Sequence, residues 1–294
     1  MEKLDVYMQL TMNSLQIAAA YILFSLGLTL IFGVMRIVNF AHGEFFTLPL
    51  LVMGVLVPLL VGAQLPLIVS YALSGVLGIA ATLLLGGLIY KFALKRFQRD
   101  MTGSFVVSVG LSLLLQGVFL ETFGGVPTKL PTLVEGTVNI LGAFVTVQRL
   151  IITGCALLVA VFMCWTIVSS RLGKALRAVA EDHEAAMLQG IPYRRIALAG
   201  FLIATVLAAI AAVLLSPVTV SSPIIGNDYL IRGFIAIVIG GLGSIPGAIL
   251  GSVLIAVIES LGGYYFDPTW ATITMFALTM FVLLVRPKGI LGNG

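Results

Sequence analysis

Charged side chains are scarce in this sequence, making up 10% of its 294 residues, whereas 60% are hydrophobic. The long runs without any charge lie at 6–35, 45–90, 101–120, 150–170, 196–227, 233–258 and 268–285. About 20 apolar residues span the hydrocarbon of a bilayer, so the second run can hold two spans and most of the others one. This shortage of charge is incompatible with a soluble globular chain and predicts an all-α, polytopic helical membrane protein.

Cysteine is also rare, with only Cys155 and Cys164, nine residues apart in one apolar segment. A helix would place them roughly 13 Å apart along its axis, too far for a disulfide. A basic leader with a short apolar core and cleavage site is lacking too, because Glu2, Lys3 and Asp5 precede the first run. We therefore expect no disulfide framework, and we expect the first span to remain as a membrane anchor rather than to be cleaved off as a signal peptide.

Several chemical motifs are missing. No G-x-x-x-x-G-K-[ST] stretch occurs, so we expect no ATP at a P-loop of this chain. No Ser, His and Asp set has a catalytic context, and His42 and His183 are too isolated in sequence to predict a metal site. The chain is predicted not to be an enzyme and to hold no cofactor of its own, so any energy for work must come from other subunits.

Basic residues crowd two loops, 91–99 and 171–195, which the positive-inside rule places in the cytoplasm. The same pattern explains the net charge of +4 without any nucleic acid partner. The expected spans are 9–35, 44–61, 67–90, 104–121, 149–169, 196–216 and 270–285. Residues 229–259 are apolar but broken by glycines, which predicts a pair of short helices and about eight transmembrane helices in all. Counting back from the C-terminus puts the N-terminus outside and the NFAHG stretch at the inner face, and residues 124–146 become an outer loop with a short hairpin or half-helix.

The loop from Arg171 to Arg195 has the pattern of an interfacial helix at about 172–190. Its charges are ordered against the helix macrodipole, with cations near the start and Glu181, Asp182 and Glu184 near the end. We therefore expect the basic ends to face anionic lipid and the acidic middle to contact a partner. One side of this helix is predicted to be apolar, formed by Leu172, Leu176, Val179, His183, Ala186 and Met187.

Within this loop, Glu184, Ala185, Ala186 and Gly190 have the spacing E-A-A-x-x-x-G, typical of the cytoplasmic loop of ABC importer permeases. Small side chains let a partner surface approach, and a glycine lets the chain turn. The alternative is an interfacial helix that rests on lipid without any partner.

Polar side chains inside the apolar runs are candidates for a transport path. Glu44 and Glu259 are costly in a bilayer, so each should face a cavity or pair with a cation, with Arg36 and Arg232 as the expected partners. Asn39 and His42 could serve the same path, or could satisfy backbone groups freed at a helix break.

The glycine-rich stretch allows two interpretations as well. Its glycines, at 240, 243, 247 and 251, recur along one face and let another backbone approach closely. Alternatively, Gly240, Gly241, Gly243 and Ser244 line the path and offer freed carbonyls to a zwitterionic substrate.

Three stretches carry a family resemblance: IVNFAHGEFF, LGKALRAVAEDHEAAMLQGI and GGLGSIPGAILGSVLIAVIES. In order and spacing, the chain resembles the permease subunits of branched-chain amino acid ABC transporters, the shorter of two paralogous kinds. The resemblance implies one permease domain over 1–294 in the bacterial inner membrane, forming half of a translocation path with a paralogue or a second copy. It also implies two ATP-binding subunits that hold ATP and Mg, and a periplasmic or lipid-anchored binding protein. Coupling to the ATP-binding subunits would involve Glu181, Glu184, Ala185, Ala186 and Gly190.

The substrate and the energy source are left open by the sequence. Members of such a family also carry urea, short amides and other amino acids. A transporter of another class, driven by an ion gradient, would use Glu44 or Glu259 as its coupling site.

Overall fold

The computed structural model describes residues 2–97 and 100–292, and most of this chain is helical. The helices are α1 (Glu2–Met35), η1 (Phe40–Gly43), α2 (Glu44–Gly62), α3 (Leu67–Phe92), η2 (Leu94–Phe97), α4 (Met101–Phe123), α5 (Val147–Ser169), α6 (Arg171–Glu181), α7 (His183–Leu188), α8 (Tyr193–Leu215), α9 (Ile225–Gly240), α10 (Ile245–Tyr265) and α11 (Pro268–Val285). Among the described residues, eight helices are long and apolar enough to cross a membrane, namely α1, α2 with η1, α3, α4, α5, α8, α10 and α11. The prediction of a polytopic helical membrane protein is confirmed.

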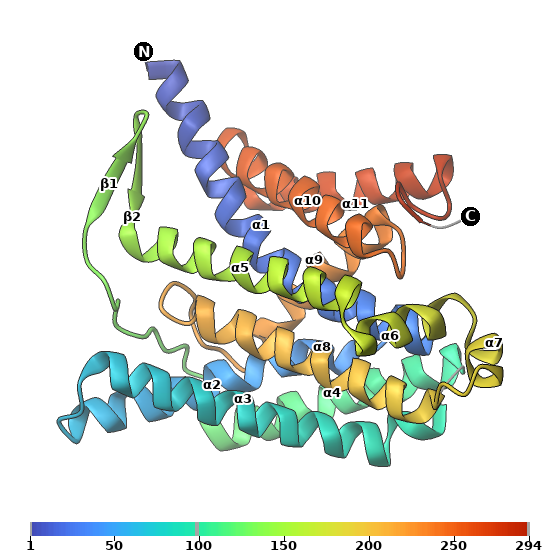
Figure 1. The fold of residues 1–294 in the computed structure, drawn as a ribbon. Helices are drawn as coiled ribbons and strands as arrows, with labels where there is room; N and C mark the ends of the chain where they lie inside the picture. Colours follow the sequence, from blue (N-terminus) through green and yellow to red (C-terminus); the bar gives the residue numbers. More distant parts are fainter. Residues whose placement is uncertain (1, 98–99, 293–294) are drawn as a thin grey trace.

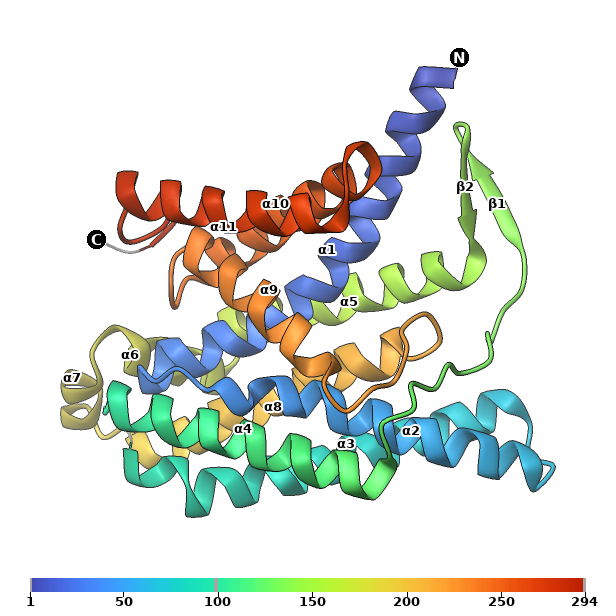
Figure 2. The ribbon, with the colours of Figure 1, turned by 180° about the vertical axis from the view of Figure 1, so that it is seen from behind.

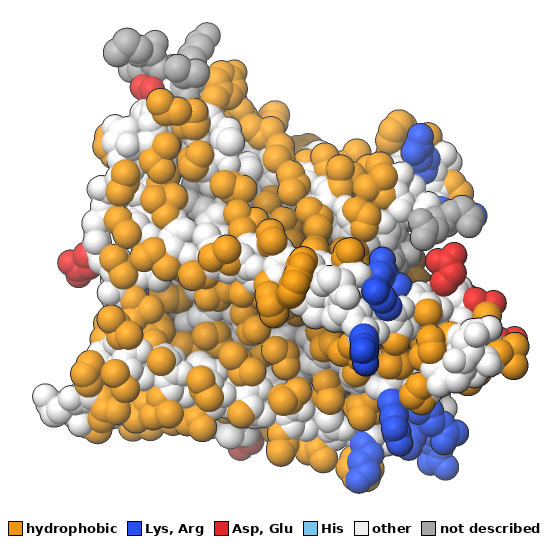
Figure 3. Space-filling view, viewed as in Figure 1, with side chains coloured by type: hydrophobic (Ala, Val, Ile, Leu, Met, Phe, Trp, Pro, Cys, Tyr) orange, Lys and Arg blue, Asp and Glu red, His pale blue; other side chains and the backbone are white. Residues whose placement is uncertain are grey.

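The long helices run between two ends of the molecule (Figure 1). We call the end with the N-terminus and the strand pair the outer end, and the end with α6, α7 and the C-terminus the inner end. Lys and Arg side chains gather at the inner end, while apolar side chains cover the sides (Figure 3). The cations of that end belong to α3, η2, α6, the start of α8 and the residues after α11. This asymmetry is the positive-inside pattern that the sequence predicts.

Helix α1 is the centre of the bundle, packed against α5, α8, α9 and α10. Its apolar window is 83% buried, far more than that of any other span. The small side chains of Ala18, Ala19 and Ala20 are buried and let the neighbouring helices approach closely. A helix buried on all sides needs no polar face, which explains why the sequence of α1 shows no amphipathic pattern.

The outer loop after α4 forms a β-hairpin, which is one of the two structures predicted for it, a short hairpin or a half-helix. Strands β1 (Thr137–Ile140) and β2 (Ala143–Thr146) are antiparallel, with Ile140 opposite Ala143. Leu141 and Gly142 form the two-residue turn, both with positive φ, which matches the right-handed twist of the strands. The hairpin stands beside the first turns of α1, where the Phe144 amide donates a hydrogen bond of 2.9 Å to Gln9 Oε1.

The pair of short helices predicted at 229–259 is partly wrong. Helix α9 has 16 residues and is too short to span, but α10 has 21 and qualifies as a span. The glycines at 241 and 243 take positive φ and break the chain before α10 starts, where Ser244 caps it and Pro246 occupies its first turn. All the breaking residues therefore lie in one turn at the inner end, and α10 continues without interruption.

Candidate functional site

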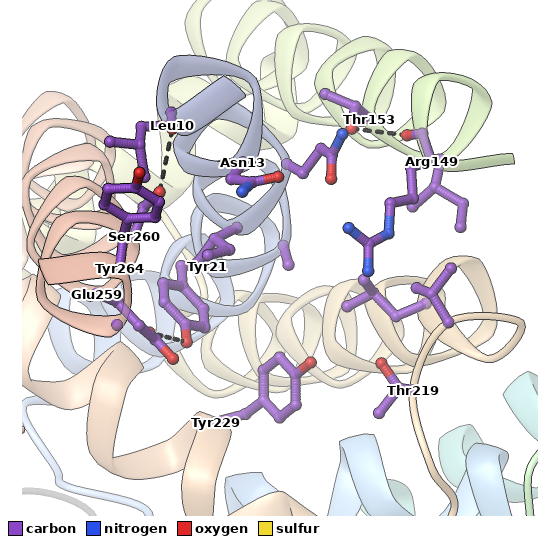
Figure 4. Close-up of a pocket in the computed structure, with 17 residues that line it drawn as sticks. Leu10, Asn13, Tyr21, Arg149, Thr153, Thr219, Tyr229, Glu259, Ser260 and Tyr264 are labelled. Carbon is purple, nitrogen blue, oxygen red and sulfur yellow. Dashed lines mark hydrogen bonds between the residues drawn. The ribbon is translucent and has the colours of Figure 1, made fainter. Parts of the chain in front are cut away.

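A cavity of about 510 Å³ lies in the outer half of the bundle, between α1, α5, α8, α9 and α10. Figure 4 shows polar side chains reaching into it from different helices. Its lining comprises Leu10, Asn13, Gln16, Ile17, Ala20, Tyr21, Arg149, Ile152, Thr153, Leu215, Val218, Thr219, Tyr229, Glu259, Ser260, Gly263 and Tyr264. The cavity thus combines charged, aromatic and aliphatic walls.

Glu259 is the acidic group of this cavity. Its Oε2 accepts a hydrogen bond of 2.5 Å from the Tyr21 hydroxyl and lies 3.3 Å from Nε of Arg232. The predicted pairing of Glu259 with Arg232 is confirmed. The two side chains lie at ion-pair distance, but Arg232 Nε makes no hydrogen bond to any of the described residues. Arg232 also lies 3.9 Å from Asp228, one turn earlier on α9.

Arg149 supplies a cation on another wall of the cavity. It lies in the first turn of α5, directly after the hairpin, and its side chain extends into the space between α5 and the loop that carries Thr219 (Figure 4). Within the described part of the chain, no carboxylate lies at ion-pair distance from its guanidinium. The cavity therefore holds a carboxylate and a separate, uncompensated cation.

Glu44 lies in a second polar cluster, buried at the start of α2. Its Oε1 accepts hydrogen bonds from Ser112 Oγ at 2.8 Å and from Gln116 Nε2 at 2.7 Å. Gln116 also exchanges hydrogen bonds with Asn227 of α9, at 3.0 and 3.3 Å. The prediction that Arg36 pairs with Glu44 is wrong, because Arg36 reaches the Glu181 carbonyl at 3.4 Å instead. Neutral donors of α4 take the place of the expected cation at Oε1, whereas the buried Oε2 has no hydrogen-bond partner among the described residues.

The count of spans predicts that the NFAHG stretch lies at the inner face, and this prediction is wrong. Residues 36–39 are not helical, with a turn at Arg36 (φ +53°), and lead back into the bundle. There the buried His42 ring packs edge-on against Phe24 of α1, with centroids 4.8 Å apart. His42 also contacts Gly27, eight residues before the end of α1, or about 12 Å from that end. Asn39 Oδ1 accepts the Ala41 amide at 3.1 Å and caps η1, which confirms its backbone role. For His42 the backbone role stays a prediction, because its ring lies near the Phe24 backbone but neither ring nitrogen makes a hydrogen bond of ordinary geometry among the described residues.

The glycines of the α9–α10 turn confirm the packing interpretation. Gly240 lies against Gly247, and Gly251 against Ala236, with no space for a side chain between the backbones. The freed carbonyls expected here are occupied, because Ile239 and Gly240 accept the Ile290 and Leu291 amides at 2.8 Å. Gly241, Gly243 and Ser244 lie in the same turn at the inner end, remote from the outer cavity to which Glu259 contributes. Their role in a path stays a prediction.

The single helix predicted at about 172–190 is wrong, since Asp182 divides it into α6 and α7. Asp182 is extended (φ −147°, ψ 106°), and its side chain accepts the Glu184 and Ala185 amides at 2.9 and 3.1 Å. These hydrogen bonds lower the pKa of the Asp182 carboxyl. Asp182 and Glu184 therefore stand at the start of a second helix, where they favour its macrodipole, while Glu181 is the last residue of α6.

The α6–α7 elbow ends in a Schellman turn. Gly190 has φ +82°, its amide donates to Met187, and the Ile191 amide donates to Ala186. Glu181, Glu184 and Ala185 are exposed, and Leu188 is 87% exposed. Three side chains depart from the predicted apolar face, because Leu172 and Met187 are exposed and His183 is only partly buried. Ala186 is the one buried residue of α7. The exposed face of α7 is thus small and partly apolar, on a helix too short to enter the membrane.

Sequence reasoning missed several groups of these sites, namely Tyr21, Ser112, Gln116, Arg149, Asn227 and Tyr229. Gln116 and Asn227 carried a usable signal, because amides within apolar runs seldom face lipid. Arg149 stands between an outer loop and a span, where a cation has no unusual meaning in sequence.

The comparisons with known proteins agree on one family. Residues 10–283 match the family described as branched-chain amino acid transport system / permease component. The high-affinity branched-chain amino acid transport system permease protein BraD of Pseudomonas aeruginosa is 32% identical, over 98% of this chain and 96% of its own. The high-affinity branched-chain amino acid transport system permease protein LivH of Escherichia coli K12 is 32% identical, over 99% of this chain and 97% of its own. The probable branched-chain amino acid transport permease protein LivH of Methanocaldococcus jannaschii is 25% identical, over 92% of this chain and 88% of its own. No solved structure matches. Since the match covers nearly the full length, the chain belongs to the permease component family of branched-chain amino acid transport systems.

Proposed function

We propose that the chain is the permease subunit of an ATP-driven importer for branched-chain amino acids in a bacterial inner membrane. It would form half of the translocation path, beside a second permease subunit that is a paralogue or another copy. Family membership and the printed names of the relatives support the substrate class. The α6–α7 elbow at the basic, inner end is the observation that carries the ATP-driven mechanism.

The elbow has the features of a docking element for a cytoplasmic subunit. It projects from the inner end beyond the spans (Figure 1), and α7 exposes Glu184, Ala185 and Leu188 together. Leu188, 87% exposed, and Met187, 44% exposed, give α7 an apolar surface outside the spans that a partner could cover. Binding of this face to an ATP-binding subunit would transmit closure of that subunit to α6 and, through buried Leu176 and Val179, to the bundle.

The signature residues have different tasks in this proposal. Glu181, Glu184 and Ala185 are available to a partner, and Gly190 fixes the direction in which the chain leaves α7. Ala186 is buried and positions α7 on the bundle instead of contacting the partner. ATP and Mg would be bound by the partner subunits, and a periplasmic or lipid-anchored protein would deliver the substrate.

Reconstitution tests this proposal directly. The chain, its permease partner and the ATP-binding subunits are placed in proteoliposomes, with ATP inside and binding protein and radiolabelled leucine outside. We expect leucine uptake that needs ATP, persists with an uncoupler, and is not inhibited by excess urea or acetamide. Uptake driven by a proton or sodium gradient without ATP would instead indicate a secondary transporter.

A further inference from the structure

We propose that the outer cavity binds the transported amino acid as a zwitterion, with the carboxylate at Arg149 and the ammonium group at Glu259. This inference rests on the proposed function and adds a location and a recognition chemistry to it. Figure 4 shows the two side chains on different walls, α5 and α10, with Tyr21 beside Glu259 and Thr219 on the side of Arg149. A cavity of about 510 Å³ lies within the range of small-molecule sites in proteins.

The acidic wall has an acceptor to spare. Oε2 of Glu259 is engaged by Tyr21 and Arg232, whereas Oε1 has no hydrogen-bond partner in the part of the chain that the structure describes. A primary ammonium could donate to that free oxygen. The rings of Tyr21 and Tyr229 also line the cavity, and aromatic rings attract ammonium groups through their faces. This wall therefore suits a cation that arrives with its own donors.

The basic wall has a donor to spare. The Arg149 guanidinium lies on the cavity without a carboxylate at ion-pair distance among the residues described. Guanidinium groups bind carboxylates through two parallel hydrogen bonds, which fix the orientation of the ligand. Asn13 and Gln16 of α1 line the same cavity and can serve the remaining polar atoms.

The rest of the lining favours an apolar side chain. Aliphatic surface for such a side chain comes from Leu10, Ile17, Ile152, Leu215 and Val218, which also line the cavity. Urea or a short amide carries no charged group, so it would leave the Arg149 guanidinium without a carboxylate and Oε1 of Glu259 without an ammonium donor. An aliphatic zwitterion would supply both charged groups and place its side chain on the aliphatic lining.

An aminophospholipid headgroup shares part of this chemistry, because it carries a primary ammonium and an anion. The proposal commits to the amino acid, and the experiment separates the two sources. The measurement is the alkylation rate of a single cysteine at Thr219, on the cavity wall, in a chain lacking Cys155 and Cys164. A cysteine at Ser222, in the same loop but outside the lining, is the matched control.

The complex with its permease partner and ATP-binding subunits is placed in phosphatidylcholine liposomes without binding protein and treated with N-ethylmaleimide. We expect L-leucine to slow alkylation at Thr219→Cys but not at Ser222→Cys. Leucinol, which lacks the carboxylate, and isocaproate, which lacks the ammonium group, should protect at least about ten-fold less well, as expected for loss of one charge-assisted hydrogen bond.

Substitutions on the two walls complete the test. Arg149→Gln should raise the leucine concentration needed for half-protection about ten-fold or more, whereas Lys129→Gln, an exposed outer cation outside the cavity, should leave it unchanged. Glu259→Gln should weaken protection similarly. Because Glu259 also pairs with Arg232, Arg149→Gln, at an exposed position, is the decisive variant.

Equal protection by all three ligands, or none by leucine, would overturn the proposal. So would slow alkylation that depends on phosphatidylethanolamine in the liposomes and not on leucine, which would assign the cavity to lipid. These outcomes leave the proposed function standing if the wild-type complex still imports leucine with ATP. Failure of that import would reject the proposed function itself, whatever happens at Thr219.

Discussion

Gln116 donates a hydrogen bond of 2.7 Å to Glu44 inside the bundle, and the same amide nitrogen lies 3.0 Å from Asn227 Oδ1. One side chain of α4 therefore links the start of α2 to α9. Gly226 strengthens this link, because its amide donates to Thr47 and its backbone lies against Gly43. The broken segment 36–43 and the short helix α9 are thus joined as one unit.

Glu44→Gln should retain ATP-driven uptake close to the wild-type rate. The amide oxygen can still accept from Ser112 and Gln116, so the cluster persists without a titratable group. Glu44→Leu should lower thermal stability, since each buried polar group left unpaired costs about 1–3 kcal/mol. Uptake and a melting curve in detergent measure the two effects. A folded Gln variant without uptake would show that ionisation at this position is required, as in gradient-driven transport.

Gly190→Val should uncouple the importer while the protein still reaches the membrane. At φ +82°, a β-branched residue costs roughly 1–2 kcal/mol, although no atom lies within 4 Å of the added Cβ. That strain would tilt α7 without unfolding the bundle. Substrate-stimulated ATP hydrolysis and leucine uptake should fall together.

Gly124→Val is a control at the outer end, because Gly124 also has positive φ (+79°) and open space around an added Cβ. Its ψ of 168° is essentially restricted to glycine, so the strain of Val there is at least as large as at Gly190. Gly103 cannot serve, since a Cβ there would collide with Asp100 and Phe97. Similarly, Ala185→Trp tests the exposed face of α7 better than a change at the buried Ala186. If the Gly190 and Gly124 variants lost activity equally, α7 would have no special part in coupling.

Asp182→Ala should loosen α7, whereas Asp182→Asn should preserve it, because an amide oxygen can still cap the helix. Hydrogen exchange of the Glu184 and Ala185 amides, corrected for intrinsic rates, measures this. The lowered pKa of Asp182 means that the cap is fully present above the usual aspartate pKa of about 4 and is lost as pH falls through the lowered value. Wild-type protection should therefore persist at pH 5. Loss of protection already at that pH would contradict the capping role.

Gly251→Ala should destabilise the bundle, because its Cβ would collide with the Ala236 backbone of α9. Overpacking of this kind costs about 1–3 kcal/mol. Gly263→Ala, in the same helix with nothing within 4 Å, should leave stability unchanged or raise it by up to about 1 kcal/mol. Melting temperatures of the two purified variants test the difference. Similar melting points would argue against close contact of α9 and α10.

Cysteine labelling should establish the sidedness of the two ends. In a chain lacking Cys155 and Cys164, a cysteine at the exposed Gln189 should resist an impermeant thiol reagent applied to intact cells. A cysteine at Leu141, 73% exposed at the hairpin tip, should react. The reverse pattern would invert the topology.

The spans were predictable because a charge-free run of about 20 residues has few alternatives in a bilayer. The ends of α2, α3 and α5 lie within two residues of the predicted bounds. The break at Asp182 was less visible, since a helical pattern runs through it and only the unfavourable order of charges indicated a second helix start. In the same way, the glycines between 240 and 251 predict a break in the chain, but they do not indicate that only α9 is shortened while α10 keeps the length of a span.

Long-range contacts account for the other differences. Arg36 and Glu44 are close in sequence, but the chain turns at Arg36 (φ +53°) and the guanidinium reaches the Glu181 carbonyl instead. Ser112 and Gln116 take the place of the expected cation. Nothing local to Arg149 indicates that α5 faces α10 across a cavity. Such a site depends on the packing of five helices, which sequence periodicity does not determine.

The hydrogen bonds from Ile290 and Leu291 to the end of α9 have a consequence for biosynthesis. The donors for these carbonyls are synthesised some fifty positions after the carbonyls themselves. The α9–α10 turn would therefore wait in the membrane with its inner end incomplete until the segment after α11 has been made. A nascent chain arrested directly after α11 would hold every described span yet lack this closure, so the inner turn distinguishes chains that carry this segment from chains that do not.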